Sequence, residues 1–321
     1  MRATSWICLL AATVVAAGCS SAPRVGPRPS PLPPASVRTV RVQVGEAGKA
    51  VRRVALEDYA RAAALSEFAP PSGEEAVIER MLEVQVVIAR SYALAHLGRH
   101  ARQGFDLCST THCQLYEPSR LKTSRWAAAA AEAVRRTAGA VLWHEGAPAA
   151  AMFHADCGGH TSTSVSAWGG TERAYLRAVR DDGPADGAHA AWTYTVPVAA
   201  MAAALNGDAR TRVGDRIDTI RVLDRDASGR AATVALHGLE ERLVRGEDVR
   251  AALARRFGAR AVRSTLFDVR RDGPSFVFTG RGFGHGVGLC QAGALARIRA
   301  GAKAADVLRR YYPGTTLRAS N

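Results

Sequence analysis

The stretch that decides the fold reads Gly280-Arg281-Gly282-Phe283-Gly284-His285-Gly286-Val287-Gly288-Leu289-Cys290-Gln291-Ala292-Gly293-Ala294. Alternating glycines lose packing area and backbone entropy, so they indicate a close approach of another backbone or ligand, or positive φ angles. The apolar run before this stretch predicts a strand, and the run after it predicts a helix. The register does not fit G-x-G-x-x-G, and no Gly-Lys-Ser/Thr follows, so the pattern does not indicate a nucleotide site.

The composition limits the classes of partner. A chain of this length is enough for one large domain or two small ones. Its 43 Lys and Arg residues against 29 Asp and Glu residues give a formal charge of +14 over 321 residues. This excess either serves solubility or attracts a polyanion. Because no basic helix interleaved with aromatic residues is present, we do not expect nucleic acid as a partner. Anionic wall polymers or lipid surfaces suit the chain better.

The N-terminus has the form of a lipoprotein signal peptide. The apolar residues 6–15 follow a basic residue and precede Ala16-Ala17-Gly18-Cys19. This run is too short to span a membrane, and small residues directly before a cysteine resemble a lipoprotein cleavage box. Residues 1–18 are therefore expected to be removed, which would leave a lipid anchor on Cys19.

The segment after the signal peptide predicts where the protein is held. Residues 19–36 are rich in proline, serine and arginine, and are expected to form a semi-extended tether. Lipoprotein sorting rules imply that Ser20, in place of aspartate, favours the outer membrane. We therefore expect residues 37–321 to fold on the periplasmic face of the cell envelope, held there by the lipid.

Hydrophobic periodicity predicts an α+β fold for residues 37–321, with a mixed β-sheet and flanking helices. Strands are expected at residues 40–44, 51–54, 192–196, 216–224, 231–237, 241–244, 267–270 and 276–278, and a hairpin is expected from 140–144 and 149–154. Helices are expected at residues 60–68, 74–96, 124–137, 246–257 and 292–299. Residues 192–263 are expected to form an inserted or second lobe.

Glu67 is the sharpest candidate for acid–base chemistry. It stands between Leu65 and Phe68 at an expected helix end, before two prolines. A carboxyl in partly apolar surroundings keeps its proton near neutral pH, and a general acid needs such a proton to protonate a glycosidic oxygen. An exposed glutamate at a helix end explains the same residues, and these residues alone favour that second interpretation.

Other segments carry a pattern that extends over nearly the whole mature chain. In order, they are Leu56-Glu57-Asp58-Tyr59, Ser66-Glu67-Phe68, Gln85, Ala89-Arg90-Ser91-Tyr92-Ala93, Phe153-His154-Ala155-Asp156-Cys157-Gly158-Gly159-His160-Thr161, the glycine stretch and Tyr311-Tyr312-Pro313-Gly314-Thr315. In this order and spacing, they resemble the SpoIID/LytB family of bacterial cell-wall proteins, which act in sporulation and in amidase modification.

The resemblance implies a peptidoglycan lytic transglycosylase. Active members cleave the glycan between N-acetylmuramic acid and N-acetylglucosamine, and the muramic C6 hydroxyl closes on C1 to give a 1,6-anhydro end. Glu67 falls on the family's proposed catalytic glutamate. One carboxyl serves as acid and then as base, so no second carboxylate at hydrolase spacing is needed. Whether stem peptides must first be removed from the glycan stays open.

Two alternatives to this activity stay open. The family's modifier branch implies a non-catalytic wall-binding protein that enhances an N-acetylmuramoyl-L-alanine amidase, which would then be a partner. A zinc hydrolase is the third interpretation, although the chain carries no H-E-x-x-H motif or equivalent.

Four further residues are candidates for binding the substrate. Arg90 lies in an expected helix, and is either a surface residue or a bidentate holder of Glu67 or of the lactyl carboxylate. Gln85 is a substrate or packing amide. His285 either donates to a sugar hydroxyl or orients Glu67, or else it is a structural imidazole bonded to nearby backbone. Gln291 has the same two interpretations.

The cysteines suggest a metal site. Cys108, His112 and Cys113 lie in one loop, with His100 upstream as the expected fourth ligand of a structural zinc. Some proteins of the family bind zinc, and the His–Cys set resembles that site. A Cys108–Cys113 disulfide is the alternative in an oxidising periplasm. Cys157 and Cys290 lie in two other motifs, and a disulfide between them is a further alternative. The four thiols allow three sets of disulfide pairs, and the sequence does not choose among them.

Overall fold

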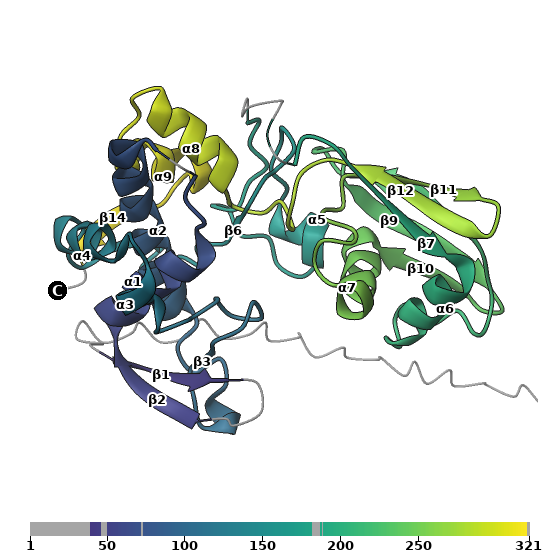
Figure 1. The fold of residues 1–321 in the computed structure, drawn as a ribbon, viewed down its shortest axis with the longest axis horizontal. Helices are drawn as coiled ribbons and strands as arrows, with labels where there is room; N and C mark the ends of the chain where they lie inside the picture. The colour runs from purple at the N-terminus through teal and green to yellow at the C-terminus, as the bar shows by residue number, and fades with distance from the viewer. Residues whose placement is uncertain (1–38, 46–49, 72, 182–186, 188, 320–321) are drawn as a thin grey trace, which may run out of the picture. The chain divides into compact units, whose positions relative to one another are not determined.

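The computed structural model describes residues 39–45, 50–71, 73–181, 187 and 189–319 (Figure 1). The expected signal peptide, Cys19 and the tether lie outside these residues. Within the described part, the α+β class is confirmed by helices interspersed with several small sheets. No helix in this part is long and apolar enough to cross a membrane.

The first hydrophobic core is built around α2 (Glu75–Ala95). This helix is buried at every position from Val84 to Leu94, which is the pattern of a helix covered on all sides. It contacts α1 (Leu56–Glu67), α4 (Ala127–Arg136), α8 (Gln291–Arg299) and α9 (Ala304–Tyr311). Segments more than 200 residues apart in sequence therefore share one core.

Small sheets border this first core. The strand β1 (Thr39–Val44) pairs antiparallel with β2 (Ala50–Ala55) and parallel with β3 (Leu107–Cys108). The strand β4 (Ala140–His144) lies between β5 (Ala147–Pro148) and β14 (Thr316–Ala319). The short helices η1 (Ala101–Gln103), α3 (Arg120–Thr123) and α5 (Ser164–Trp168) lie in the connections.

The expected hairpin of residues 140–144 and 149–154 is only partly correct. The turn returns as β5, but β6 (Phe153–His154) leaves the hairpin and pairs parallel with β13 (Leu289–Cys290). This pairing brings the His154 motif beside the glycine stretch. The glycines at 282, 284, 286 and 288 have positive φ, as expected from their alternation. A Cβ on Gly288 would lie 2.0 Å from the Met152 carbonyl oxygen, so the expected close approach of another backbone segment is also present.

A second core begins at Trp192. It contains β7 (Trp192–Pro197), β8 (Ile217–Arg225), β9 (Ala231–Gly238) and β10 (Glu241–Arg245), with α6 (Val198–Asn206) and α7 (Gly246–Phe257). The expected boundary at residue 263 needs correction, because β12 (Ser275–Gly280) pairs with both β7 and β11 (Phe267–Asp272). The second core therefore continues to Phe278.

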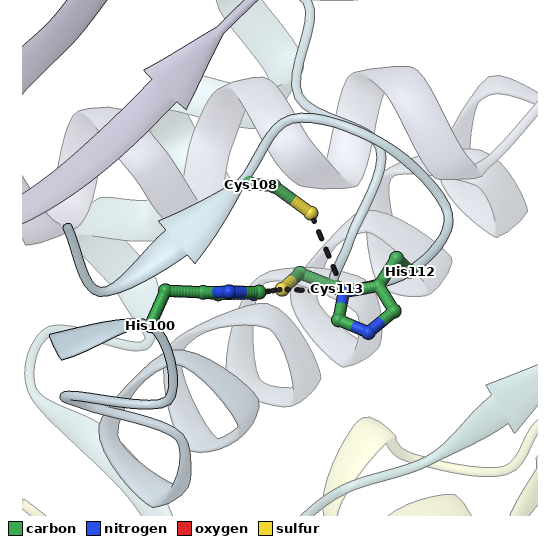
Figure 2. A group of neighbouring side chains, drawn as sticks. All are labelled: His100, Cys108, His112 and Cys113. Carbon is green, nitrogen blue, oxygen red and sulfur yellow. Dashed lines mark hydrogen bonds between the residues drawn. The ribbon is translucent and has the colours of Figure 1, made fainter. Parts of the chain in front are cut away.

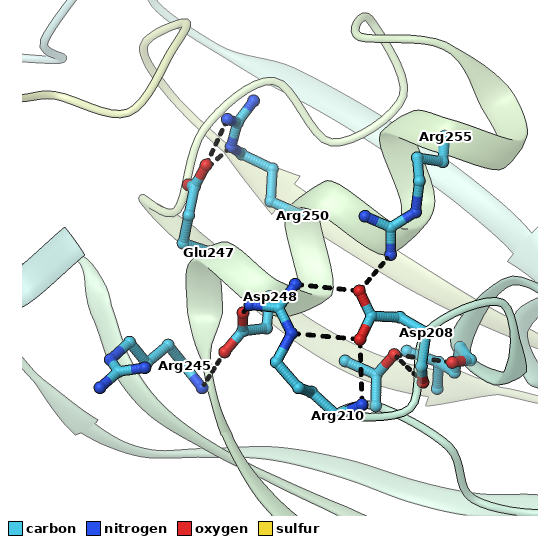
Figure 3. Close-up of polar contacts among 9 residues, drawn as sticks. Asp208, Arg210, Arg245, Glu247, Asp248, Arg250 and Arg255 are labelled. Atoms are coloured by element: carbon cyan, nitrogen blue, oxygen red, sulfur yellow. Dashed lines mark hydrogen bonds and ion pairs between the residues drawn. The ribbon is translucent and has the colours of Figure 1, made fainter. Parts of the chain in front are cut away.

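An ion-pair network ties the end of α6 to α7 in the second lobe (Figure 3). Asp208 accepts from Arg210 and from Arg255, each at 2.9 Å, and Arg210 also reaches Asp248 at 2.5 Å. The Arg210 guanidinium holds the pKa of the Asp208 carboxyl below its usual range. Both arginines are exposed, so we assign this network a modest role in fixing the loop after α6.

Candidate active site

Glu67 occupies the last position of α1, where the helix leaves the first core. Its Oε1 atom accepts a hydrogen bond from the Leu115 backbone N–H at 2.5 Å. Burial raises the pKa of the Glu67 carboxyl to about 6, and the Leu115 N–H opposes part of that effect. The side chain is only partly exposed. The environment therefore shifts the pKa of this carboxyl toward neutral pH, which is the direction that the sequence predicted.

The glycine stretch reaches Glu67 through α8. Gln291 is the first residue of this helix, and its Nε2 atom donates to the Glu67 backbone carbonyl at 3.2 Å. The last carbonyl groups of a helix have no partner within the helix, so this amide satisfies an otherwise free acceptor. Gln291 thus positions Glu67 through the Glu67 backbone, whereas the Glu67 carboxyl is bonded to the Leu115 N–H.

A surface hollow of about 520 Å³ adjoins the loop that holds Glu67. Leu115, whose N–H binds the carboxylate, lines this hollow together with Tyr116. The rest of the lining is rich in hydroxyl groups, from Ser109, Thr110, Thr111 and Ser119. Hydroxyl groups beside an aromatic ring form a surface suited to a sugar.

The four expected zinc ligands come together in the structure (Figure 2). The ligand atoms of His100, Cys108, His112 and Cys113 all lie within 4.8 Å of one another. The His100 Nε2 atom is 3.4 Å from the Cys113 sulfur, and the His112 Nδ1 atom is 3.7 Å from the Cys108 sulfur. Both cysteines are free thiols, so the alternative disulfide is not formed here.

The chemistry of this donor set fits zinc. Two sulfurs and two imidazole nitrogens make one of the common tetrahedral sets for Zn²⁺. His100 also carries an outer partner, because its Nδ1 atom lies 2.6 Å from the Gln103 Oε1 atom. An Nδ1–H that donates to this oxygen leaves the Nε2 lone pair toward Cys113, as in ligating histidines. The sequence did not single out Gln103.

The four candidate metal ligands are linked to Glu67 by the segment that follows Cys113. Leu115 lies two residues after Cys113, so the ligand loop carries the N–H group that binds Glu67. Charge on Glu67, Cys108 and Cys113 contributes to the raised pKa values of Tyr59 and Tyr92, although burial is the larger cause for both. Because Leu115 belongs to this segment, a shift of the segment would move the N–H group that donates to Glu67.

Arg90 does not hold Glu67, which corrects the expectation from sequence. Its side chain is completely buried and forms a bidentate pair with Glu57, at 2.9 Å and 2.6 Å. Its Nη1 atom also donates to the Ala140 carbonyl at 2.8 Å. All three contacts tie α1 and β4 to the central helix. Arg90 thus supports the first core, and Glu57 is the partner that sequence did not identify.

Gln85 and His285 also take structural positions. Gln85 is only 1% exposed, and its Nε2 atom has no hydrogen-bond partner, so it packs within the core and does not face a substrate. The His285 Nδ1 atom accepts from the Val287 N–H at 3.0 Å. Burial, with Arg250 and Arg230 adding to it, lowers the pKa of His285 to about 3. The imidazole is therefore neutral and bonded to backbone, and no contact joins it to Glu67.

Ser66 is a functional neighbour that sequence reasoning missed. Its hydroxyl donates to the Ala62 carbonyl at 2.7 Å and accepts from the Glu117 N–H at 3.0 Å. It therefore connects the end of α1 to the segment that follows Cys113. The only sequence signal was its place beside Glu67.

Comparisons with known proteins bear on this site. A family model described as stage II sporulation protein, SpoIID, matches residues 45–144, which include Glu67 and all four thiol and imidazole ligands. A second model, described as a domain of unknown function, matches residues 186–288, which cover most of the second lobe.

Three relatives extend the comparison. Stage II sporulation protein D of Bacillus amyloliquefaciens is 25% identical over 83% of this chain and 75% of its own length. The protein of the same name from Bacillus subtilis is 24% identical over 84% of this chain and 76% of its own length. An amidase enhancer of Bacillus subtilis is 45% identical over 60 residues, which are 19% of this chain and 8% of that protein.

Proposed function

The chain belongs to the SpoIID family and has a cell-wall-related function, and on that premise we propose that it is a peptidoglycan lytic transglycosylase. The proposed reaction cleaves the bond between N-acetylmuramic acid and N-acetylglucosamine, and leaves a 1,6-anhydro end. The observation that carries the proposal is the environment of Glu67, a partly buried carboxyl with a pKa of about 6 that is bonded to the N–H of Leu115, a residue in the lining of a hydroxyl-rich hollow. The glycan strand would lie along that hollow.

Glu67 would act twice. The protonated carboxyl gives its proton to the glycosidic oxygen, and the bond from that oxygen to C1 breaks. The C6 hydroxyl of the same sugar then attacks C1, and its proton passes to the Glu67 carboxylate. The acid is regenerated and no water is consumed. The Leu115 N–H stabilises the carboxylate between the two steps, since a hydrogen bond to the charged form favours it.

We further propose that His100, Cys108, His112 and Cys113 bind a structural zinc ion. Such an ion would supply the energy that fixes the ligand loop. The residues of that loop then place the Leu115 N–H and the hydroxyl groups of the hollow.

The lipid anchor at Cys19, and a location at the periplasmic face of the outer membrane, belong to the same proposal.

The second candidate function is enhancement of an amidase without catalysis. The local identity of 45% to an amidase enhancer favours it, although it covers only 60 residues. In that case the hollow would bind glycan, and the partner amidase would cleave the amide bond that joins the stem peptide to muramic acid.

The products of a digest separate these functions. Purified protein is incubated with glycan strands, with and without stem peptides, and the released sugars are identified by mass spectrometry. Anhydro-muramic ends support the transglycosylase, and reducing ends would mean a hydrolase. If no sugar is released and binding to sacculi is retained, the result would support the function of an amidase enhancer.

A further inference from the structure

A second group of metal-binding side chains lies in the first core, at the junction of β6 and β13. The ligand atoms of His154, Cys157 and Cys290 lie within 4.8 Å of one another, and all three residues are buried. Parallel pairing places Cys290 opposite His154, and Cys157 follows three residues after His154. This cluster shares no residue with the four ligands near Glu67.

One nitrogen of the cluster lacks a partner. The His154 Nδ1 atom lies 3.2 Å from the Val287 carbonyl, which is an acceptor, so Nδ1 carries the hydrogen. The Nε2 atom is then a lone-pair acceptor, and it is buried with no hydrogen-bond partner. An uncharged, buried imidazole with a free lone pair is the form that binds a metal.

The two sulfurs are held in place by different hydrogen-bond partners. The Cys290 sulfur accepts from the Cys157 N–H at 3.2 Å and from the Gly293 N–H at 3.3 Å, at the first turn of α8. These two N–H groups fix the position of the Cys290 sulfur beside Cys157. The Cys157 sulfur donates to the Asp181 Oδ2 atom at 3.6 Å. Asp181 is in turn fixed by Arg297 at 3.0 Å and by the Tyr311 hydroxyl at 2.5 Å.

We propose that His154, Cys157 and Cys290 form a second metal site, for a thiophilic divalent cation of the Zn²⁺ class. Binding would release the two thiol protons to solvent and leave two thiolates and one imidazole on the ion. The Asp181 Oδ2 atom is 3.6 Å from the Cys157 sulfur, next to these three ligands, and a water between Asp181 and the ion would complete the coordination. Three negative charges would then face the ion, with the Arg297 and Arg230 guanidiniums around them.

A disulfide explains less of this geometry than a metal does. Bonding Cys157 to Cys290 would leave the His154 Nε2 atom buried and unpaired, whereas an ion satisfies all three side chains at once. Both cysteines are free thiols in the structure. The site would also fix the start of α8, where Gln291 follows Cys290 and donates to the Glu67 carbonyl. The inference itself does not depend on the proposed reaction.

Metal counting tests the site. Full-length protein is stripped with a chelator under reducing conditions, reloaded with Zn²⁺ or Co²⁺, desalted and analysed by inductively coupled plasma mass spectrometry. Wild type should bind about two ions per chain, and Cys290→Ser and Cys113→Ser about one each. In the double variant Cys108→Ser/Cys113→Ser, the remaining Co²⁺ should show a sulfur-to-cobalt charge-transfer band.

The double variant keeps the proposal testable even if Cys290→Ser does not fold. If the double variant Cys108→Ser/Cys113→Ser binds no ion, the proposal is overturned. It is also overturned if Cys290→Ser retains all the metal of wild type. Peptide mapping of the wild type under non-reducing conditions is the third arm. A Cys157–Cys290 disulfide found there would replace the metal site, and two alkylatable thiols after metal removal would support it.

Discussion

Replacing Glu67 by glutamine should stabilise the protein in a pH-dependent way. The pKa of Glu67 rises from its ordinary value of 4.5 to about 6 in the folded protein. The folded state therefore holds a proton that the unfolded state has already lost. This contribution to stability is fully present below the unfolded value and is lost as the pH rises through about 6. A difference of about 1.5 in pKa corresponds to ~2 kcal/mol in the free energy of unfolding.

The variant Glu67→Gln keeps the shape and still accepts from the Leu115 N–H, but it carries no charge at any pH. Relative to wild type, its free energy of unfolding should be nearly unchanged at about pH 4, and ~2 kcal/mol higher at about pH 7.5. Urea unfolding at both pH values measures the difference. The control is Glu145→Gln at a side chain that is 86% exposed, where little change is expected. An equal difference at the two pH values would refute the burial of the Glu67 carboxyl.

Three further predictions follow from the same contacts. Since Glu67 must be protonated to act as an acid, the rate of glycan cleavage should decline above about pH 6. The variant His285→Asn should show the same decline, because the His285 imidazole of the wild type is already neutral at that pH. A decline that moves to another pH in His285→Asn would contradict the assignment to Glu67. The variant Arg90→Leu should lower the free energy of unfolding by ~2 kcal/mol, because it removes charge-assisted hydrogen bonds to Glu57 and to the Ala140 carbonyl; a loss no larger than that of the exposed Arg102→Leu would contradict it. Cys108→Ser should lower the zinc content by about one ion and reduce the melting temperature, and an unchanged metal content would remove His100 and its neighbours as ligands.

Local elements were predictable from the sequence because their signals are short-range. The helix from Glu75 to Ala95 and the strand pair β11–β12 follow directly from hydrophobic periodicity. The loop that gathers two cysteines and two histidines was also predictable, because the ligands lie within 14 residues of one another in sequence. The glycine stretch predicted positive φ angles and close backbone contacts, and the structure has both.

Contacts between distant segments were not predictable in the same way. The pairing of Arg90 with Glu57 depends on how α1 packs on α2, and a chain rich in arginine and glutamate offers many equivalent partners. The departure of β6 from the expected hairpin is set by β13, more than 130 residues later. The end of the second lobe depends on β12 pairing back to β7. Each of these is a choice made by tertiary packing, which local patterns do not encode.

The most direct test of the central claim is the rate at which Glu67→Gln forms anhydro-muramic ends. Wild type and variant are compared on glycan strands without stem peptides, and binding to sacculi is measured in parallel. If Glu67 is the acid and then the base, the rate should fall by roughly 10²–10⁴-fold while binding is retained, since the lining of the hollow is unchanged. A variant that forms anhydro ends as fast as wild type would contradict the assignment of Glu67.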